Sequence, residues 1–162
     1  MIQLQIRWED ANVRKMLAGF PSVTRDEMRT AMRALLKAEL DEVNRLSEKR
    51  IADPRGAFRG ANYIQLTGNA SSVGGKVANR SPHAFYVEYG RKPGKRPPVA
   101  ALRGWAGRVL GDENAAFALA KAIGLRGTQG KFIYRDAGKG TASRAALAAS
   151  RIPRRIVTRV VT

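Results

Sequence analysis

The sequence predicts an α+β fold in which one long N-terminal helix covers a small antiparallel sheet of about four to five strands, with two to three further shorter helices. Three observations predict it. Apolar and polar residues alternate over residues 2–8, an apolar stripe with helical spacing runs from Met28 to Leu46, and strand-like runs separated by turn residues follow. The chain has 162 residues, which fits a single domain with its own core.

The first element expected is a half-buried strand over residues 2–8, because apolar residues alternate with polar ones from Ile2 to Trp8. A short helix is expected over residues 10–18, where Gly19 and Pro21 interrupt it.

The long helix is expected to start at Thr24, since Glu27 three positions later makes a capping box. Its end is expected near Ile51, because Pro54 disfavours the helical conformation at Asp53. A single stripe on so long a helix must cover a sheet or pack along a neighbouring subunit. The opposite face is expected to be exposed and charged; it carries Lys37, Glu39, Asp41, Glu42, Arg45, Glu48 and Lys49.

A loop is expected over residues 54–61, followed by an antiparallel meander with turn residues between its strands. The pair Gly74-Gly75 lies inside the middle strand, which favours a bulge or an edge there. The predicted strands of the meander are 63–67, 71–79 and 83–89.

Helices dominate the rest of the predicted chain. Pro98 suits the first turn of a helix that Gly111 ends, and Asp112-Glu113 start the next helix. An Ala-rich helix over residues 141–150 is expected to end at Pro153. The β-branched residues of 156–161 then predict a strand, so residues 137–162 form a C-terminal extension of helix plus strand, used in subunit contacts.

The formal net charge of +17 is unevenly distributed. Residues 1–53 hold 10 basic and 9 acidic groups, whereas residues 54–162 hold 20 basic and 4 acidic groups. An excess of this size attracts nucleic acid or an acidic neighbouring subunit. The chain has no cysteine, which excludes disulfides and thiolate metal sites and favours a cytosolic origin. Neither a secretion signal nor a membrane span is expected.

The inventory of catalytic groups is sparse. His83 is the only histidine, so a multi-histidine metal site is excluded and a structural or exposed histidine is expected. A Ser-His-Asp triad would need His83 with Ser72 or Ser81, and no nucleophile-elbow motif or P-loop occurs. Three of the four acidic pairs sit at helix starts or on a charged helix face, which argues against a nuclease. We therefore expect no enzyme activity, no cofactor and no metal.

Residues 82–105 combine an aromatic segment, a basic loop and an apolar helix, and two interpretations are open. The aromatic and basic side chains could stack on and neutralise single-stranded nucleic acid. Alternatively, the aromatics face the core and the loop docks on a protein, which the nearby Leu102 and Trp105 favour. The residues concerned are Phe85, Tyr86, Tyr89, Arg91, Lys92, Lys95 and Arg96.

Two motifs carry a resemblance to a known family. The segment Phe85-Tyr86-Val87-Glu88-Tyr89-Gly90, followed by a loop, Pro97-Pro98, Leu102 and Trp105, resembles the tail-completion or neck family of long-tailed phages, relatives of minor tail protein Z. The helix at 116–123 and the Gly-x-x-Gly-Lys-aromatic turn at 127–132 look like a second motif of that family, except that members usually have Pro-Phe after the basic residue. The resemblance covers residues 1–136.

The resemblance implies a structural virion protein without catalysis. Such proteins are made in the host cytoplasm and form rings, commonly hexameric, at the joint between capsid and tail, through which DNA passes. Neighbouring head-completion or connector proteins and tail-terminator or tail-tube proteins would be its partners. A tail terminator or another minor tail ring protein is one alternative, and a free basic nucleic-acid-binding protein is another.

The resemblance also assigns roles to residues. The loop after Gly90 would be an arm that contacts a neighbouring subunit or ring through Arg91, Lys92, Lys95 and Arg96. The arm would be anchored by Tyr86, Glu88, Tyr89, Gly90, Leu102 and Trp105. The candidates for facing double-stranded DNA in the lumen are Arg126, Lys131, Arg135, Arg154 and Arg155.

Overall fold

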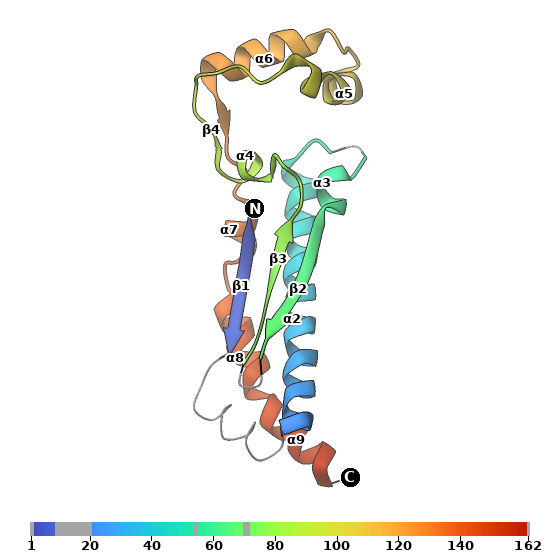
Figure 1. Ribbon diagram of the computed structural model, residues 1–162, viewed down its shortest axis with the longest axis vertical. Coiled ribbons are helices and arrows are strands. Elements are labelled where there is room, and N and C mark those ends of the chain that lie inside the picture. The colour runs from blue at the N-terminus through green and yellow to red at the C-terminus, as the bar shows by residue number, and fades with distance from the viewer. Residues whose placement is uncertain (1, 9–20, 54, 70–71, 162) are drawn as a thin grey trace.

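The computed structural model describes residues 2–8, 21–53, 55–69 and 72–161. The molecule is elongated, with a body of sheet and helices and an arm at one end (Figure 1). The predicted α+β class, with a long helix against small antiparallel sheets, is confirmed. The elements are β1 (Gln3–Trp8), α2 (Pro21–Arg50), α3 (Ala57–Gly60), β2 (Asn62–Gly68), β3 (Val73–Asn79), α4 (Ala84–Tyr89), β4 (Gly90–Arg91), α5 (Val99–Leu110), α6 (Ala115–Arg126), β5 (Thr128–Gln129), α7 (Ile133–Ala137), α8 (Thr141–Ser150) and α9 (Ile152–Val161).

The main sheet has the strand order β1-β3-β2, and both pairings are antiparallel. The glycine pair in β3 therefore marks neither an edge nor a bulge, since β3 is the central strand and both registers run through it unbroken. Gly75 serves close packing instead, because a Cβ there would lie 2.3 Å from Leu36 Cδ1 of α2. A side chain at this position would displace the Leu36 side chain, which is fully buried between the helix and the sheet.

Helix α2 forms the spine of the body, as its apolar stripe predicts. It packs on β2 and β3 on one side and on α7, α8 and α9 on another. It begins at Pro21, which suits a first helical turn, so Thr24 is a buried residue inside the helix and not its N-cap. The largest fully buried apolar side chains of this core are Met28, Met32, Leu36, Val43, Val77 and Ile133.

Glu39 corrects the expectation of a uniformly exposed charged face. Its side chain is fully buried, and the guanidinium Nε of Arg144 in α8 donates to Glu39 Oε1 at 2.9 Å. A carboxylate out of water needs such a partner, so this ion pair joins the C-terminal region to the spine.

Two predicted strands are helices. Residues 84–89 form α4, because Ala84 and Glu88, four positions apart, are the residues that become buried. Residues 152–161 form α9, in which Ile152 and Ile156 pack on the core with the same spacing. Pro153 thus lies in the first turn of a helix and does not end one.

Several shorter segments are closer to expectation. Residues 57–60 add a short helix, α3, to the predicted loop at 54–61, and the carboxylate of Asp53 accepts hydrogen bonds from its first N–H groups. Gly111 ends α5 in the left-handed conformation, as predicted. The predicted helix over residues 10–18 lies outside the described residues.

Candidate interaction arm and the clamp at its base

The arm comprises residues 90–129. Its two ends form a two-stranded antiparallel ladder, in which Gly90 pairs with Gln129 and Arg91 pairs with Thr128. Between them, α5 and α6 pack against each other and lie across the end of the molecule, away from the sheet (Figure 1). The projecting structure is therefore a helical hairpin, of which the predicted basic loop is only the first part.

Glu88 holds the base of the arm. It is buried, and its Oε2 accepts hydrogen bonds from the N–H groups of Ile133 at 2.7 Å and Tyr134 at 3.0 Å. Its Oε1 accepts the N–H of Arg135 at 2.9 Å. A carboxylate at the N-terminus of a helix satisfies the otherwise unpaired N–H groups there, so Glu88 caps α7.

Backbone contacts complete this connection. The N–H groups of Lys131 and Phe132 donate to the carbonyls of Val87 and Glu88 at 2.8 and 3.1 Å. Gly130 lies so close that a Cβ there would be 2.5 Å from the Glu88 carbonyl oxygen. We call residues 87–90 and 130–135 the clamp. It joins the two sequence motifs on which the family resemblance rests.

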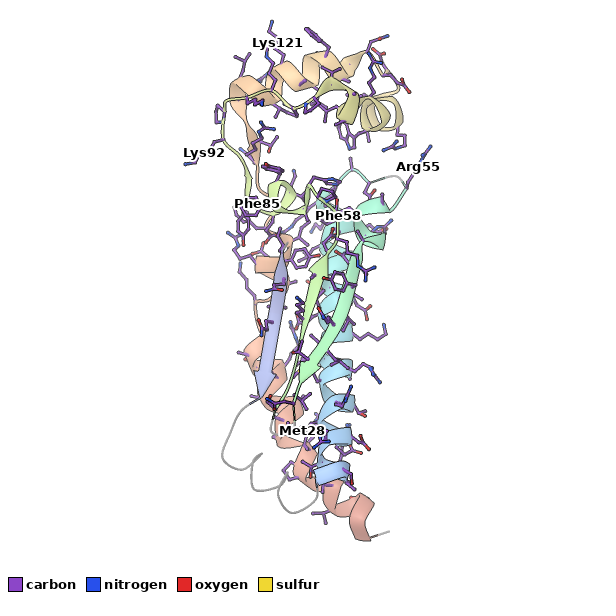
Figure 2. The ribbon with its side chains drawn as sticks, viewed as in Figure 1. Met28, Arg55, Phe58, Phe85, Lys92 and Lys121 are labelled. Carbon is purple, nitrogen blue, oxygen red and sulfur yellow. The ribbon has the colours of Figure 1, made fainter. Side chains whose placement is uncertain are left out.

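The aromatic residues of α4 point outward, which corrects the expectation that they fill the core. Phe85, Tyr86 and Tyr89 are 53%, 50% and 56% exposed. Their rings contact one another, with the Phe85 and Tyr89 centroids 5.0 Å apart, and the Arg91 guanidinium lies 5.7 Å from the Tyr86 centroid. The base of the arm thus presents an aromatic cluster beside Arg91, the first cation of the arm. Phe85 of the cluster and Lys92, which follows Arg91, are labelled in Figure 2.

The predicted arm cations lie on the segment that leads to α5. Lys92, Lys95 and Arg96 are exposed, and Arg91 donates a hydrogen bond to the Lys95 carbonyl. The whole arm carries 8 basic and 2 acidic residues, a balance of +6. Figure 2 shows Lys92 and Lys121 on its outer surface, pointing away from the body. The arm is therefore a cationic projection.

A hollow of about 670 Å³ lies between the arm and the body. The predicted anchors Leu102 and Trp105 line it, and the indole N–H of Trp105 donates to the carbonyl of Ala52 at 3.2 Å, which links α5 to the end of the spine. His83 also lines it and is exposed, with Ser81 Oγ 3.0 Å from its Nδ1.

The five candidate DNA-facing cations do not form one patch. Arg126 ends α6 in the arm, whereas Lys131 and Arg135 belong to the clamp. The Arg135 guanidinium lies 3.9 Å from the Phe132 ring centroid. Arg154 and Arg155 are exposed on α9, which lies at the opposite end of the molecule (Figure 1).

Asp136 is a charge centre that the sequence reasoning did not single out. Its carboxylate accepts from Lys139 Nζ at 2.9 Å, Arg50 Nη1 at 2.8 Å and Arg135 Nε at 3.1 Å. These hydrogen bonds, that of Lys139 foremost, hold the pKa of the Asp136 carboxyl well below its ordinary value. The cations Arg135 and Lys139, which are close to Asp136 in the sequence, could have indicated this centre. Arg50 could not, because it lies 86 residues away.

We expect an Asp136→Asn protein to be less stable than the wild type at neutral pH, with a difference that depends on pH. A carboxyl whose pKa is lowered by folding stabilises the fold above its unfolded pKa of about 4, and this contribution is lost as pH falls towards the folded value. Urea unfolding between about pH 7 and about pH 2 should show the difference in unfolding free energy shrink as the pH falls below about 4. The matched control is Asp41→Asn, because Asp41 pairs with Lys37 on an exposed face, where little effect is expected. A difference that persists unchanged in acid would contradict this assignment.

Among the described residues, no cluster of three or more His, Asp or Glu side chains is placed to hold a metal ion. No helix in the described part of the chain is both long enough and apolar enough to span a bilayer. No family model, curated protein or solved structure matches this chain.

Proposed function

We propose that this protein is a ring-forming structural component of the head–tail joint of a long-tailed phage, a tail-completion or neck protein through which DNA passes. The observation that carries the proposal is the clamp. The two short motifs that resemble the family are separated in sequence, yet Glu88 of the first caps the helix that follows the second. The two motifs therefore meet in one structural unit at the base of the arm, as expected if both belong to one family pattern.

The arm supports a role in assembly. A cationic helical hairpin with an exposed aromatic cluster at its base offers charge and apolar surface for a protein partner. We propose that the arm contacts a neighbouring copy or an adjoining ring of acidic character. In this proposal the protein resides in the virion after synthesis in the host cytoplasm, and its partners are further copies of itself, connector and tail proteins, and DNA in the lumen.

The test is to purify the protein alone and with neighbouring head-completion and tail proteins, and to examine the products by electron microscopy and mass measurement. We expect closed rings, or incorporation as a ring at one end of a tail or connector. A protein that stays monomeric and never joins particles would exclude this function. Incorporation at the far end of an otherwise finished tail would favour the alternative of a tail terminator.

A free nucleic-acid-binding protein is the second candidate, because Arg91 lies beside the exposed Tyr86 ring in an arm of charge +6. Aromatic faces and cations in this arrangement suit stacking on single strands. Binding of short DNA that weakens steeply with salt would support it, and absence of binding at low salt would remove it.

The arm cations provide a direct test of the assembly role. We expect joint replacement of Arg91, Lys92, Lys95 and Arg96 by serine to abolish assembly while leaving thermal unfolding nearly unchanged, since these residues are exposed or half-buried on the arm. The control removes the same charge elsewhere by serine replacement of the exposed Arg33, Lys37, Lys49 and Arg151. If the arm variant forms normal particles, or if both variants lose assembly to the same extent, a specific role of the arm is refuted.

A further inference from the structure

Among the described residues, no further strand pairs with β1 or β2, so the main sheet ends at these two strands. Strand β3 is central, so β1 and β2 form the flanks (Figure 1). Each edge strand has one set of backbone groups that faces its partner in the sheet and an alternate set that faces outward. The hydrogen bonds at the ends of the β2–β3 ladder identify these sets.

On β2 the outward groups belong to the even-numbered residues. The N–H of Asn69 donates to the Ser72 carbonyl and the N–H of Arg80 donates to the Ala61 carbonyl, both at 3.0 Å, in line with the β2–β3 register. Hydrogen-bonded pairs alternate in an antiparallel ladder, so odd-numbered residues of β2 bond to β3. The N–H and C=O groups of Ile64 and Leu66 therefore face outward.

On β1 the same alternation leaves the odd-numbered residues outward. The even-numbered residues of β3 bond to β2, so its odd-numbered residues, such as Val77, bond to β1. Val77 is paired with Leu4, which places the backbone groups of Gln3 and Gln5 on the free edge. Within the described residues, no other backbone group bonds to Gln3, Gln5, Ile64 or Leu66 on these edges.

Helix α7 contacts β1, but the described residues of both edge strands lack the protections that the strand sequence itself can supply against pairing with another chain. Folded proteins block open edges with charges, prolines or bulges. Strand β2 contains no charged residue and no proline, and Arg7 is the only charge in β1. Both registers are unbroken, so no bulge turns either edge away.

We propose that β1 of one copy pairs with β2 of the next copy, so that the sheet continues from subunit to subunit. This inference rests on the proposed ring and names the contact that closes it. Strands β1 and β2 are each antiparallel to β3 and hence parallel to each other, so rotation about an axis along the strands gives a parallel β1–β2 junction. Two different edges that meet head to tail form a heterologous interface, and such an interface generates a ring when its rotation closes.

The side chains support a second copy as the occupant. Leu4 and Ile64 both lie opposite Val77 and therefore share the face that packs on α2. Leu4, Ile64 and Leu66 are only partly buried in one copy, and a neighbouring strand would cover them. Gln3, Gln5 and Gln65 lie on the other face, where their amides can bond across the junction.

The experiment uses proline to remove an outward N–H without disturbing the bonds to β3. Gln5→Pro does this at an exposed position of β1, and Gln5→Ala is its control. Leu66→Pro does the same on β2, with Leu66→Ala as its control. By analytical ultracentrifugation, we expect rings for the wild type and both alanine variants and monomers for each proline variant, with circular dichroism to verify folding.

Mixing provides the sharpest outcome. Gln5→Pro retains an intact β2 edge and Leu66→Pro retains an intact β1 edge, so an equimolar mixture should form dimers containing one of each. Hydrogen exchange on wild-type protein, which needs no variant to fold, should show the Gln5 and Leu66 amides protected in the ring and exposed in diluted monomer.

The outcomes separate this inference from the proposed function. Rings that persist in both folded proline variants, or edge amides that exchange freely in the ring, would overturn the edge pairing and leave the ring function standing. Loss of assembly in only one proline variant, with no mixed dimer, would indicate pairing of like edges and also overturn it. A wild type that stays monomeric with all its neighbours would refute both.

Discussion

A Gly90→Ala protein is expected to lose about 2–6 kcal/mol of unfolding free energy, from about 1–3 kcal/mol of backbone strain and about 1–3 kcal/mol of overpacking. The strain arises because φ 77° with ψ −171° is a combination that essentially only glycine adopts. Gly90 has a φ of 77°, and a Cβ there would lie 2.3 Å from the Thr128 carbonyl oxygen and 2.7 Å from the Gly130 nitrogen. Both atoms belong to the backbone of the segment that returns from the arm, so they cannot move away by a change of rotamer, as a side chain could. The clamp and the β4–β5 ladder would have to separate.

The control for Gly90 is Gly111→Ala. Gly111 also has a positive φ, 74°, but its ψ of 2° places it in the ordinary left-handed region, and no heavy atom lies within 4 Å of a Cβ placed there. It should therefore cost only the strain of the left-handed conformation, about 1–2 kcal/mol. Urea unfolding of both variants measures the difference. Equal losses would mean that Gly90 acts through its backbone conformation alone and that the close approach to Thr128 contributes nothing.

Local patterns account for the parts of the fold that were predictable from sequence. The stripe of α2, the apolar runs of β2 and β3 and the glycine after α5 all act over a few neighbouring residues, so the sequence carries their signal directly. The prediction of a strand over residues 83–89 was wrong for the opposite reason, because a distant contact decides the conformation there. Its residues favour a strand by composition, but burial of Glu88 against a segment 45 residues later decides its conformation.

The same limit applies to the candidate site. The arm cations and the two motifs could be located, because charge and glycine spacing are local features. The contact of Glu88 with the residues after Gly130 could not be predicted from the sequence. Nor could the ion pair between Glu39 and Arg144, which lie 105 residues apart. The outward aromatics follow from the helix: once Ala84 and Glu88 face inward, Phe85, Tyr86 and Tyr89 fall on the exposed side.

Glu88→Gln is expected to destabilise the protein by about 2–4 kcal/mol, although it changes neither the size nor the shape of the side chain. The carboxylate accepts N–H groups at both oxygens, from Ile133 and Tyr134 at Oε2 and from Arg135 at Oε1. An amide has only one oxygen, and its NH₂ group must face an N–H donor whichever way it is turned. The less costly orientation keeps the oxygen towards Ile133 and Tyr134 and leaves the N–H of Arg135 without its acceptor.

Two terms then add. The Arg135 N–H is part-buried, so leaving it without a partner costs about 1 kcal/mol, towards the low end of the range for buried donors. The remaining hydrogen bonds, to Ile133 and Tyr134, also lose the strengthening that a charged acceptor gives them. Glu48→Gln is the matched control, because the Glu48 side chain is 69% exposed and pairs with Arg59 at the surface, so a change within about 0.5 kcal/mol is expected. Hydrogen exchange should show faster opening at Ile133, Tyr134 and Arg135 in Glu88→Gln alone. If both variants unfold at the same urea concentration, Glu88 is not what fixes the arm to the body, and the clamp depends on its backbone contacts.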